Sequence, residues 1–270
     1  MGRKESELQM DKVRSAEMSW REVEAAVRAG KAAIFPIGST EEHGPHSPTG
    51  DYMVTDEIAA RVASQTGDVV FPCLPFGYSE YFRHYPGTIT LQHDTLFRLL
   101  EDVISGLISH GFRHIVLFNG HGGNQPIVSV LLRKIRRDHG LLVPAVSPLG
   151  FAKPEFKREV YAGAKVEHGG AGMAAYMMYL RPGTVDLSLA EDWGKKDFHG
   201  LPADLSGVVF DGSQVSLSLN MEDITPPSGS LSDPRLATAE RGERIIQHTV
   251  ERLVRFMQWF KGIDPRIQPG

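Results

Sequence analysis

Two short segments, both rich in glycine, carry side chains that could hold a metal ion. The first contains Glu41 and His43 and is followed by Asp51, and the second, residues 119–124, has His121 at its centre. Carboxylate oxygens and imidazole nitrogens together form a ligand set that zinc, manganese and iron accept. Four such residues in two segments are hard to explain as ordinary loop composition. The sequence therefore predicts a site for one or two divalent metal ions, Zn, Mn or Fe.

Some of the residues in these two segments can also be explained without a metal ion. In an extended chain alternate side chains share one side, so Glu41 and His43 are expected to face one site while Glu42 points away. Glu42 and His46 are explained equally well as turn residues. Residues 119–124 alone could cradle a phosphate ahead of a helix, but they lack the Lys-Ser/Thr ending of a P-loop. A metal site is the better interpretation.

Strand and helix patterns alternate along the chain and bring both segments to one edge of a sheet. Strand-like apolar runs span residues 32–37, 68–72, 114–118 and 141–146, and helical patterns span residues 55–64, 125–138 and 171–180 and return in the C-terminal tail. This alternation is typical of a three-layer α/β fold, with a mostly parallel sheet flanked by helices. Ligands in such folds collect at the carboxyl ends of the strands, which is where both segments begin.

The length and composition fit a single domain over residues 1–270, with a flexible or surface arm at residues 1–17. Residues 187–232 are rich in Gly, Pro, Ser and Asp, and we expect long loops or an irregular hairpin there rather than a second domain.

Charge and hydropathy argue against several classes of partner. The net charge is −4, and the densest basic run, residues 133–137, has the spacing of a solvated helix face, so nucleic acid is not an expected partner. No apolar run is long enough to cross a membrane, and no secretory signal is recognisable. The single cysteine, Cys73, cannot form an intrachain disulfide and is expected to be a small core residue. We expect a cytoplasmic protein that acts on a small-molecule substrate.

Several segments resemble the creatininase (creatinine amidohydrolase) family. Residues 38–46, Gly-Ser-Thr-Glu-Glu-His-Gly-Pro-His, resemble the opening motif of the family, which usually contains Glu-Gln-His-Gly-Pro-His, and residues 119–124 match its second motif. Residues 74–79, 86–89 and 233–242 resemble further family segments, so the resemblance spans roughly residues 20–260. These motifs are highly specific for the family and poorly specific for the substrate.

The resemblance implies a metal-dependent hydrolase that cleaves a C–N bond in an amide, a cyclic amide or a formamide. It implies Glu41, His43, Asp51 and His121 as metal ligands, with Asp51 bridging when two ions bind. The spacing from His43 to Asp51 is one residue shorter than the usual family pattern. Family members are often hexamers, so we expect a homo-oligomer.

Proton transfer and substrate binding are predicted for residues outside this ligand set. Residues 166–170 resemble the third family motif, which implies Glu167 and His168 as the catalytic residues that move protons. The alternative for His168 is that it only orders its loop or caps the following helix. We expect the side chains of Tyr78 and Ser79 to form hydrogen bonds with the substrate. We expect the backbone amides of Gly122 and Gly123 to face an oxyanion. The predicted substrate-binding residues are Tyr78, Ser79, Gly122 and Gly123.

Two positions depart from the family pattern. Met173 and Gly123 stand where relatives carry a metal-binding glutamate, so the second metal site is weak, absent, or completed by water, Glu167 or the substrate. This departure keeps two alternatives open. One is a metal-dependent ring-opening hydrolase of a cyclic ketone or lactone, and the other is a non-catalytic protein that binds a metal or small ligand.

Overall fold

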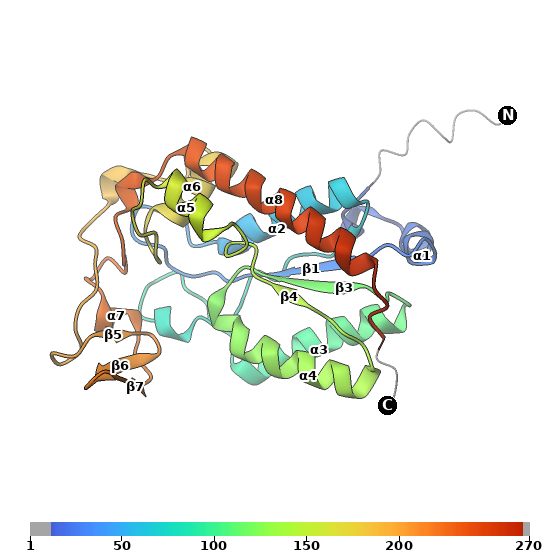
Figure 1. Cartoon of the computed structure of the whole chain (residues 1–270), viewed down its shortest axis with the longest axis horizontal. Helices are drawn as coiled ribbons and strands as arrows, with labels where there is room; N and C mark the ends of the chain where they lie inside the picture. Colours follow the sequence, from blue (N-terminus) through green and yellow to red (C-terminus); the bar gives the residue numbers. More distant parts are fainter. Residues whose placement is uncertain (1–11, 267–270) are drawn as a thin grey trace.

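A four-stranded parallel sheet forms the centre of the computed structural model, which describes residues 12–266 (Figure 1). Its strands are β1 (Ala33–Ile37), β2 (Val69–Val70), β3 (Ile115–Asn119) and β4 (Ala145–Val146). They lie in the order β2-β1-β3-β4, and every pair is parallel. The two central strands therefore end side by side, with Ile37 opposite Asn119.

The central strands are apolar throughout because helices cover both faces of the sheet. All five residues of β1 and of β3 are buried, as expected of a parallel sheet. The predicted edge strands, residues 68–72 and 141–146, are reduced to two residues each. Pro72 and Pro144 border these strands and lack the N–H group that a longer ladder needs.

Helices on the two faces complete three layers, which confirms the predicted α/β fold. Ile34, Val116 and Phe118 of the sheet pack into a core with α2, α6 and α8. Phe35 and Leu117, on the opposite face, pack with α3 and α4, and Figure 1 shows the two layers above and below the sheet. The helices are α1 (Trp20–Arg28), α2 (Asp51–Thr66), α3 (His93–Ser109), α4 (Gln125–His139), α5 (Pro154–Val160), α6 (Ala171–Leu180), α7 (Met221–Ile224) and α8 (Ala239–Lys261).

Two of the helices that border the site end as their sequences dictate. Gly67 follows α2 and Gly140 follows α4 with positive φ angles of 71° and 59°, a left-handed conformation that glycine adopts without steric cost. Helix α2 begins four residues before the predicted start at Thr55, so Asp51 is its first residue.

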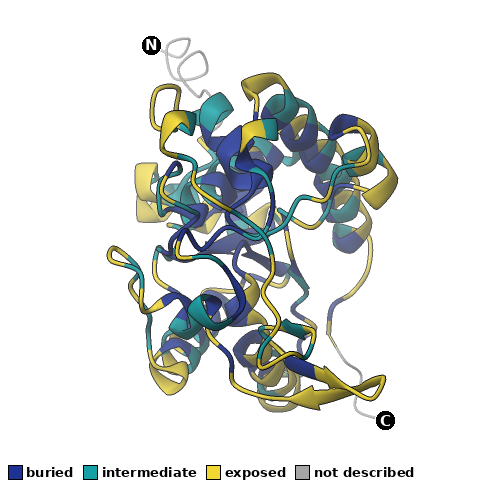
Figure 2. Cartoon of the chain, turned by 90° about the vertical axis from the view of Figure 1, so that its left-hand side faces the viewer, coloured by how far each residue is buried: buried dark blue, intermediate teal, exposed yellow. Residues whose placement is uncertain are grey.

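A second, small sheet lies at one end of the molecule, within residues 187–232. Strands β5 (Ala203–Asp204), β6 (Gly207–Phe210) and β7 (Ser213–Ser216) pair antiparallel in that order. All four residues of β7 are exposed, and Figure 2 shows the hairpin reaching away from the buried centre. The hairpin predicted there is confirmed, although its strands are regular.

The described N-terminal residues follow the edge of the main sheet. Val70 N–H donates to the carbonyl of Val13, and Arg14 forms an ion pair with Asp56 at 2.8 Å. The predicted arm therefore packs on the surface from residue 12 onward, and its first part, residues 1–11, lies outside the described residues. Within residues 12–266, none of the helices combines the length and apolar character needed to cross a membrane.

Candidate metal centre

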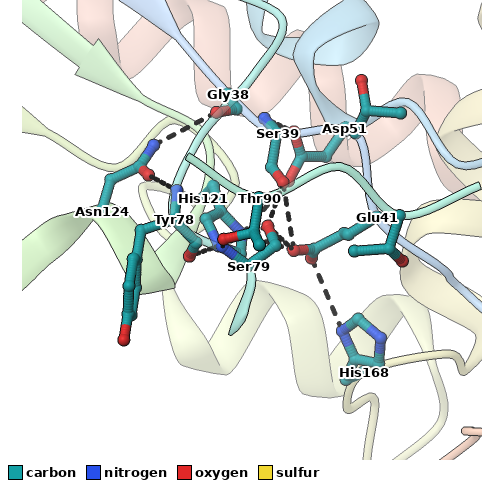
Figure 3. A network of polar contacts seen from close by, with 12 residues as sticks. Gly38, Ser39, Glu41, Asp51, Tyr78, Ser79, Thr90, His121, Asn124 and His168 are labelled. Atoms are coloured by element: carbon teal, nitrogen blue, oxygen red, sulfur yellow. Dashed lines mark hydrogen bonds and ion pairs between the residues drawn. The ribbon is translucent and has the colours of Figure 1, made fainter. Parts of the chain in front are cut away.

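The two predicted segments leave the same edge of the sheet, as the sequence indicates. Residues 38–43 follow the end of β1, residues 120–124 follow the end of β3, and Asp51 begins α2 directly beside them. Figure 3 shows Glu41, Asp51 and His121 turned toward one another. The fold therefore brings the predicted metal-binding side chains to the carboxyl ends of the central strands.

Three buried side chains, here called the first donor group, meet at His121. Its Nδ1 lies 2.9 Å from Oε2 of Glu41 and 3.4 Å from Oδ2 of Asp51. None of these side chains is more than 4 % exposed. Their donor atoms all lie within 4.8 Å of one another.

A second donor group shares Glu41 with the first. The other carboxylate oxygen, Oε1, lies 3.6 Å from Nε2 of His43 and 3.9 Å from Nδ1 of His168. The two imidazole rings stack at 5.0 Å, and Phe82 stacks on the other side of His168 at 4.4 Å. The predicted alternation is thus right for Glu41 and His43, which face the same site.

Electrostatics favour a cation at the first donor group. Burial alone raises the pKa of the Glu41 carboxyl, but the imidazoles of His121, His43 and His168 together outweigh it and the pKa falls to about 2. Burial dominates at Asp51 and raises its pKa to about 6. Burial lowers the pKa of His121, yet Glu41 and Asp51 together hold it well above its usual value. Two buried carboxylates therefore depend on one positive charge.

The donor geometry fits metal ions. Two ligands that each lie about 2.1 Å from one ion are at most about 4.2 Å apart. Glu41 lies 2.9 to 3.9 Å from the three imidazoles of His121, His43 and His168, and His121 lies 3.4 Å from Asp51, so only small adjustments are needed. The mixture of carboxylates and imidazoles suits Zn, Mn and Fe.

Hydrogen bonds hold the ligands from behind. Ser79 Oγ donates to Oε2 of Glu41 at 3.0 Å, and the backbone N–H of Ser39 donates to Oδ1 of Asp51 at 2.5 Å. Nε2 of His121 lies 2.8 Å from the main-chain oxygen of Tyr78. This contact requires Nε2 to carry the proton and leaves the lone pair of Nδ1 facing Glu41 and Asp51.

The predicted substrate-binding residues lie in different surroundings. Ser79 is fully buried against Glu41. Tyr78 contacts His121 through its main chain, while its side chain lines a separate cavity of about 720 Å³ bordered by Phe97 and Ile127. Ser79 and the main chain of Tyr78 therefore contact Glu41 and His121 of the first donor group.

Gly122 and Gly123 form a short 3₁₀ helix with Asn124, next to His121. A Cβ at position 123 would lie 2.1 Å from the Tyr78 main-chain oxygen and 2.4 Å from Nε2 of His121, whereas position 122 is open. A carboxylate side chain at position 123 is therefore sterically excluded in this backbone.

The structure treats the two predicted catalytic residues differently. His168 joins the second donor group, but the Glu167 carboxylate is paired with Nζ of Lys195 at 2.8 Å and belongs to neither donor group. Met173, the other family departure, is a residue of α6 and packs into the core.

Glu42 contradicts the prediction that it points away from the site. Its Oε1 lies 2.9 Å from Nε2 of His168, and its side chain is only 6 % exposed. The alternation fails because residues 41–44 form no strand, and Gly44 has a φ of 82°. The pKa of His168 is lowered by burial but raised overall by the adjacent Glu42 carboxylate.

Glu42 is the residue beside the donor groups whose position the sequence did not predict. The only available signal was a carboxylate in place of the glutamine that is usual in the opening motif. His46 is buried as well, but it belongs to neither group of donors found among residues 12–266.

Comparisons with known proteins agree with this geometry. The family model described as creatininase, creatinine amidohydrolase, matches residues 16–257. The chain belongs to the creatininase family. Its resemblance in motifs thus extends to nearly the whole sequence.

Curated relatives within this family are hydrolases with different substrates. Creatinine amidohydrolase of Pseudomonas putida is 32% identical over 87% of this chain and 92% of its own length. The mycofactocin precursor peptide peptidase of Mycolicibacterium smegmatis is 30% identical over 80% of each chain. The 3-dehydro-scyllo-inosose hydrolase of Thermotoga maritima is 32% identical over 44% of this chain and 39% of its own length.

Solved creatininase structures share the fold. A crystal structure of creatinine amidohydrolase superposes with a TM-score of 0.77 at 30% identity and covers 92% of this chain and 98% of the other. Structures described as a manganese creatininase and as a Zn-Zn type mutant superpose at 29% identity with TM-scores of 0.75 and 0.74, covering 92% of this chain and 98% and 97% of theirs.

Proposed function

We propose that this protein is a metal-dependent hydrolase that cleaves a C–N bond in an amide, a cyclic amide or a formamide. One observation carries the proposal: Glu41, Asp51 and His121 converge, buried, at the carboxyl ends of β1 and β3. Relatives named as an amidohydrolase and as a peptidase support it, since both classes of enzyme cleave amide bonds.

In this proposal Glu41, Asp51 and His121 hold a divalent cation, Zn, Mn or Fe, and His43 extends the ligand set. A cation bound there supplies Lewis acidity, which polarises the substrate carbonyl and activates water near neutral pH. Asp51 is fixed for this role by its place at the start of α2 and by the N–H of Ser39. Family resemblance implies a bridging role for Asp51, whereas in this structure Glu41 is the carboxylate that both donor groups share.

Other groups of the chain orient the proposed ligands and stabilise the reacting substrate. The main-chain oxygen of Tyr78 and the hydroxyl of Ser79 hold His121 and Glu41 in place. We propose that the backbone N–H groups of Gly122 and Gly123 face the oxyanion that forms on the substrate. Gly122 is exposed and has open space on its Cβ side, which leaves room for a substrate.

Proton transfer has one candidate with suitable geometry. The Glu42 carboxylate holds Nε2 of His168, which leaves Nδ1 directed at Glu41. That nitrogen can take either a proton or a metal ion, and not both at once. Family resemblance also implies Glu167 as a proton carrier, but its carboxylate is paired with Lys195 and has first to leave it.

Metal removal tests the proposed function. The purified protein is stripped with a chelator, assayed on a panel of linear amides, lactams and formamides, and reloaded with Zn²⁺ or Mn²⁺. We expect stripping to lower the release of amine about 10³-fold, because a Lewis-acid metal stabilises the transition state by several kcal/mol, and reloading to restore it. Full turnover by the stripped protein would falsify the proposal.

The Thermotoga maritima relative favours a second candidate, a ring-opening hydrolase of a cyclic ketone or lactone. The same metal site can polarise a ketone or ester carbonyl. The products separate the candidates, since amide cleavage releases an amine or ammonia and ring opening gives an acid without releasing nitrogen. Stoichiometric metal binding without turnover of either panel identifies a non-catalytic binding protein instead.

For partners and location we propose a small-molecule substrate, a homo-oligomer of six chains and a cytoplasmic site of action. The oligomer is supported by the family resemblance, and light scattering coupled to size-exclusion chromatography tests it. A reducing compartment suits the lone Cys73, which is partly buried and free.

A further inference from the structure

The second donor group needs a ligand from outside the family pattern. It contains one carboxylate, Glu41, which it shares with the first donor group. Neither of the two positions that depart from the family pattern supplies another carboxylate. A side chain at position 123 would collide with the Tyr78 carbonyl and with His121. Met173 is an apolar core residue that is only 8% exposed. A side chain from another segment therefore has to complete the set.

His168 lies where that ligand belongs. Its Nδ1 is 3.9 Å from Oε1 of Glu41, and its donor atom lies within 4.8 Å of that of His43. The ring is held between His43 and Phe82 at 5.0 and 4.4 Å, so it cannot swing freely. Only 17 % of the side chain is exposed.

Glu42 fixes which nitrogen of His168 faces the site. A carboxylate 2.9 Å from Nε2 accepts a hydrogen bond from the N–H of that nitrogen, which leaves the lone pair of the ring on Nδ1. Carboxylates commonly orient metal-binding histidines in this way. With glutamine, which is usual here in the family, this acceptor is neutral and weaker.

Glu42 is itself held from two sides. Its Oε2 accepts the backbone N–H of Gly44 at 2.7 Å, and its own N–H donates to Oγ1 of Thr88 at 3.1 Å. Gly229 closes over the carboxylate so tightly that a Cβ there would lie 2.6 Å from Oε2. The backbone of His168 is tied down nearby, because its carbonyl accepts the N–H of Leu231 at 2.8 Å.

We propose that a second divalent cation binds Oε1 of Glu41, Nε2 of His43 and Nδ1 of His168, and that Glu42 is the positioning residue for His168. The proposal rests on the proposed function, because it assumes that the first donor group holds a metal. Two imidazoles and one carboxylate form a set that holds catalytic zinc and non-haem iron in other proteins. His168 is then a ligand, and proton transfer at Nδ1 is unavailable to it.

Titration of metal-stripped protein with Co²⁺ tests the second site without any assay of turnover. The readouts are visible absorption and the number of equivalents retained after gel filtration. We expect two equivalents in the wild type and one in His168→Ala. Glu42→Ala should bind both, with the second about 10–100-fold weaker, the usual effect of removing a partner that orients a ligand.

Glu159→Gln is the matched control, because the exposed Glu159 carboxylate is paired with Arg244 and belongs to neither donor group. It should retain two equivalents with unchanged affinities. Circular dichroism and thermal melting check the folding of each variant.

A second measurement uses only the wild-type protein. In the Co²⁺-loaded protein, a histidine that binds the paramagnetic ion gives a strongly shifted N–H proton signal in the NMR spectrum. The Nε2 proton of His168, held by Glu42, should give a slowly exchanging signal of this kind that appears with the second equivalent. If His168→Ala is unstable, this spectrum decides the question.

The outcomes separate the two proposals. Wild-type protein that binds no Co²⁺ overturns the proposed function and the second site together. One equivalent in the wild type, or two in His168→Ala, overturns only the second site. If His168→Ala keeps both ions but loses turnover, His168 transfers protons instead.

Discussion

The two donor groups share Glu41 yet differ in how the fold supports them. The other members of the first group, Asp51 and His121, begin a helix and follow a central strand. In the second group, His168 belongs to the loop between α5 and α6 and is 17 % exposed, against 4 % or less for the first group. The first group lies entirely beside the carboxyl ends of the central strands, and the second is completed by a residue from a separate loop.

The two donor groups also differ in the ligand atoms that they offer. The first group offers two carboxylates and one imidazole, and the second offers one carboxylate and two imidazoles. Oxygen-rich sets suit manganese, whereas nitrogen-rich sets suit zinc. The difference indicates a firmly built site for a harder ion beside a more adaptable site for a softer one.

Removal of His121 should have the largest effect. His121→Ala takes away the imidazole at which Glu41 and Asp51 meet, so we expect the ion of the first donor group to be lost and turnover to drop about 10³-fold. Elemental analysis and product assays measure both. His139→Ala, an exposed histidine at the end of α4, is the control and should change neither. Wild-type metal content in His121→Ala contradicts the ligand assignment.

A methyl group added next to His121 should have the second-largest effect. Gly123→Ala forces a Cβ against Nε2 of His121 and the Tyr78 carbonyl. We expect a loss of about 1–3 kcal/mol in the free energy of unfolding from overpacking, and about 10²-fold in turnover from a displaced ligand. Thermal melts and kinetics measure these effects. Gly122→Ala, where the space is open, should resemble the wild type; equal losses in both variants would show that the close approach is unimportant.

Loss of a supporting hydroxyl should be milder. Ser79→Ala removes the hydrogen bond to Oε2 of Glu41, so we expect metal affinity at the first donor group to weaken about 10-fold. Competition with a chromophoric chelator measures the affinity. An unchanged affinity means that packing alone orients Glu41.

The smallest effect is expected at Glu167. Its ion pair with Lys195 joins side chains that are 31 % and 46 % exposed, and such surface pairs contribute about 0–1 kcal/mol. Glu167→Gln should therefore unfold at nearly the wild-type temperature and turn over substrate at nearly the wild-type rate. A drop in turnover of 10-fold or more with intact metal content instead supports the proton-transfer role implied by family resemblance.

The sheet and the first donor group could be predicted from sequence because local pattern decides them. β1 and β3 are continuous apolar runs that precede Glu41 and His121, and the parallel register of Ile37 with Asn119 brings the following segments together. Asp51 was predicted as a ligand, although its place as the first residue of α2 was not, because the predicted helix began at Thr55.

The second donor group could not be predicted because distant contacts decide it. His168 meets Glu42 across 126 positions in sequence, and Gly229 shapes the space around that carboxylate. The prediction for Glu42 assumed an extended strand that the chain does not form. Strand β7 left no pattern either, since all its residues are exposed and burial imposes no alternation.

Because Glu41 belongs to both donor groups, mutations at different positions of this site differ in the number of ions that they affect. A single missense mutation at codon 41 disables both ions together. A lineage that dispenses with the proposed ion of the second donor group alone can do so through the ligand positions 43 and 168, which the first donor group does not use. Natural one-ion descendants of this protein should therefore keep Glu41 and diverge at those two histidines.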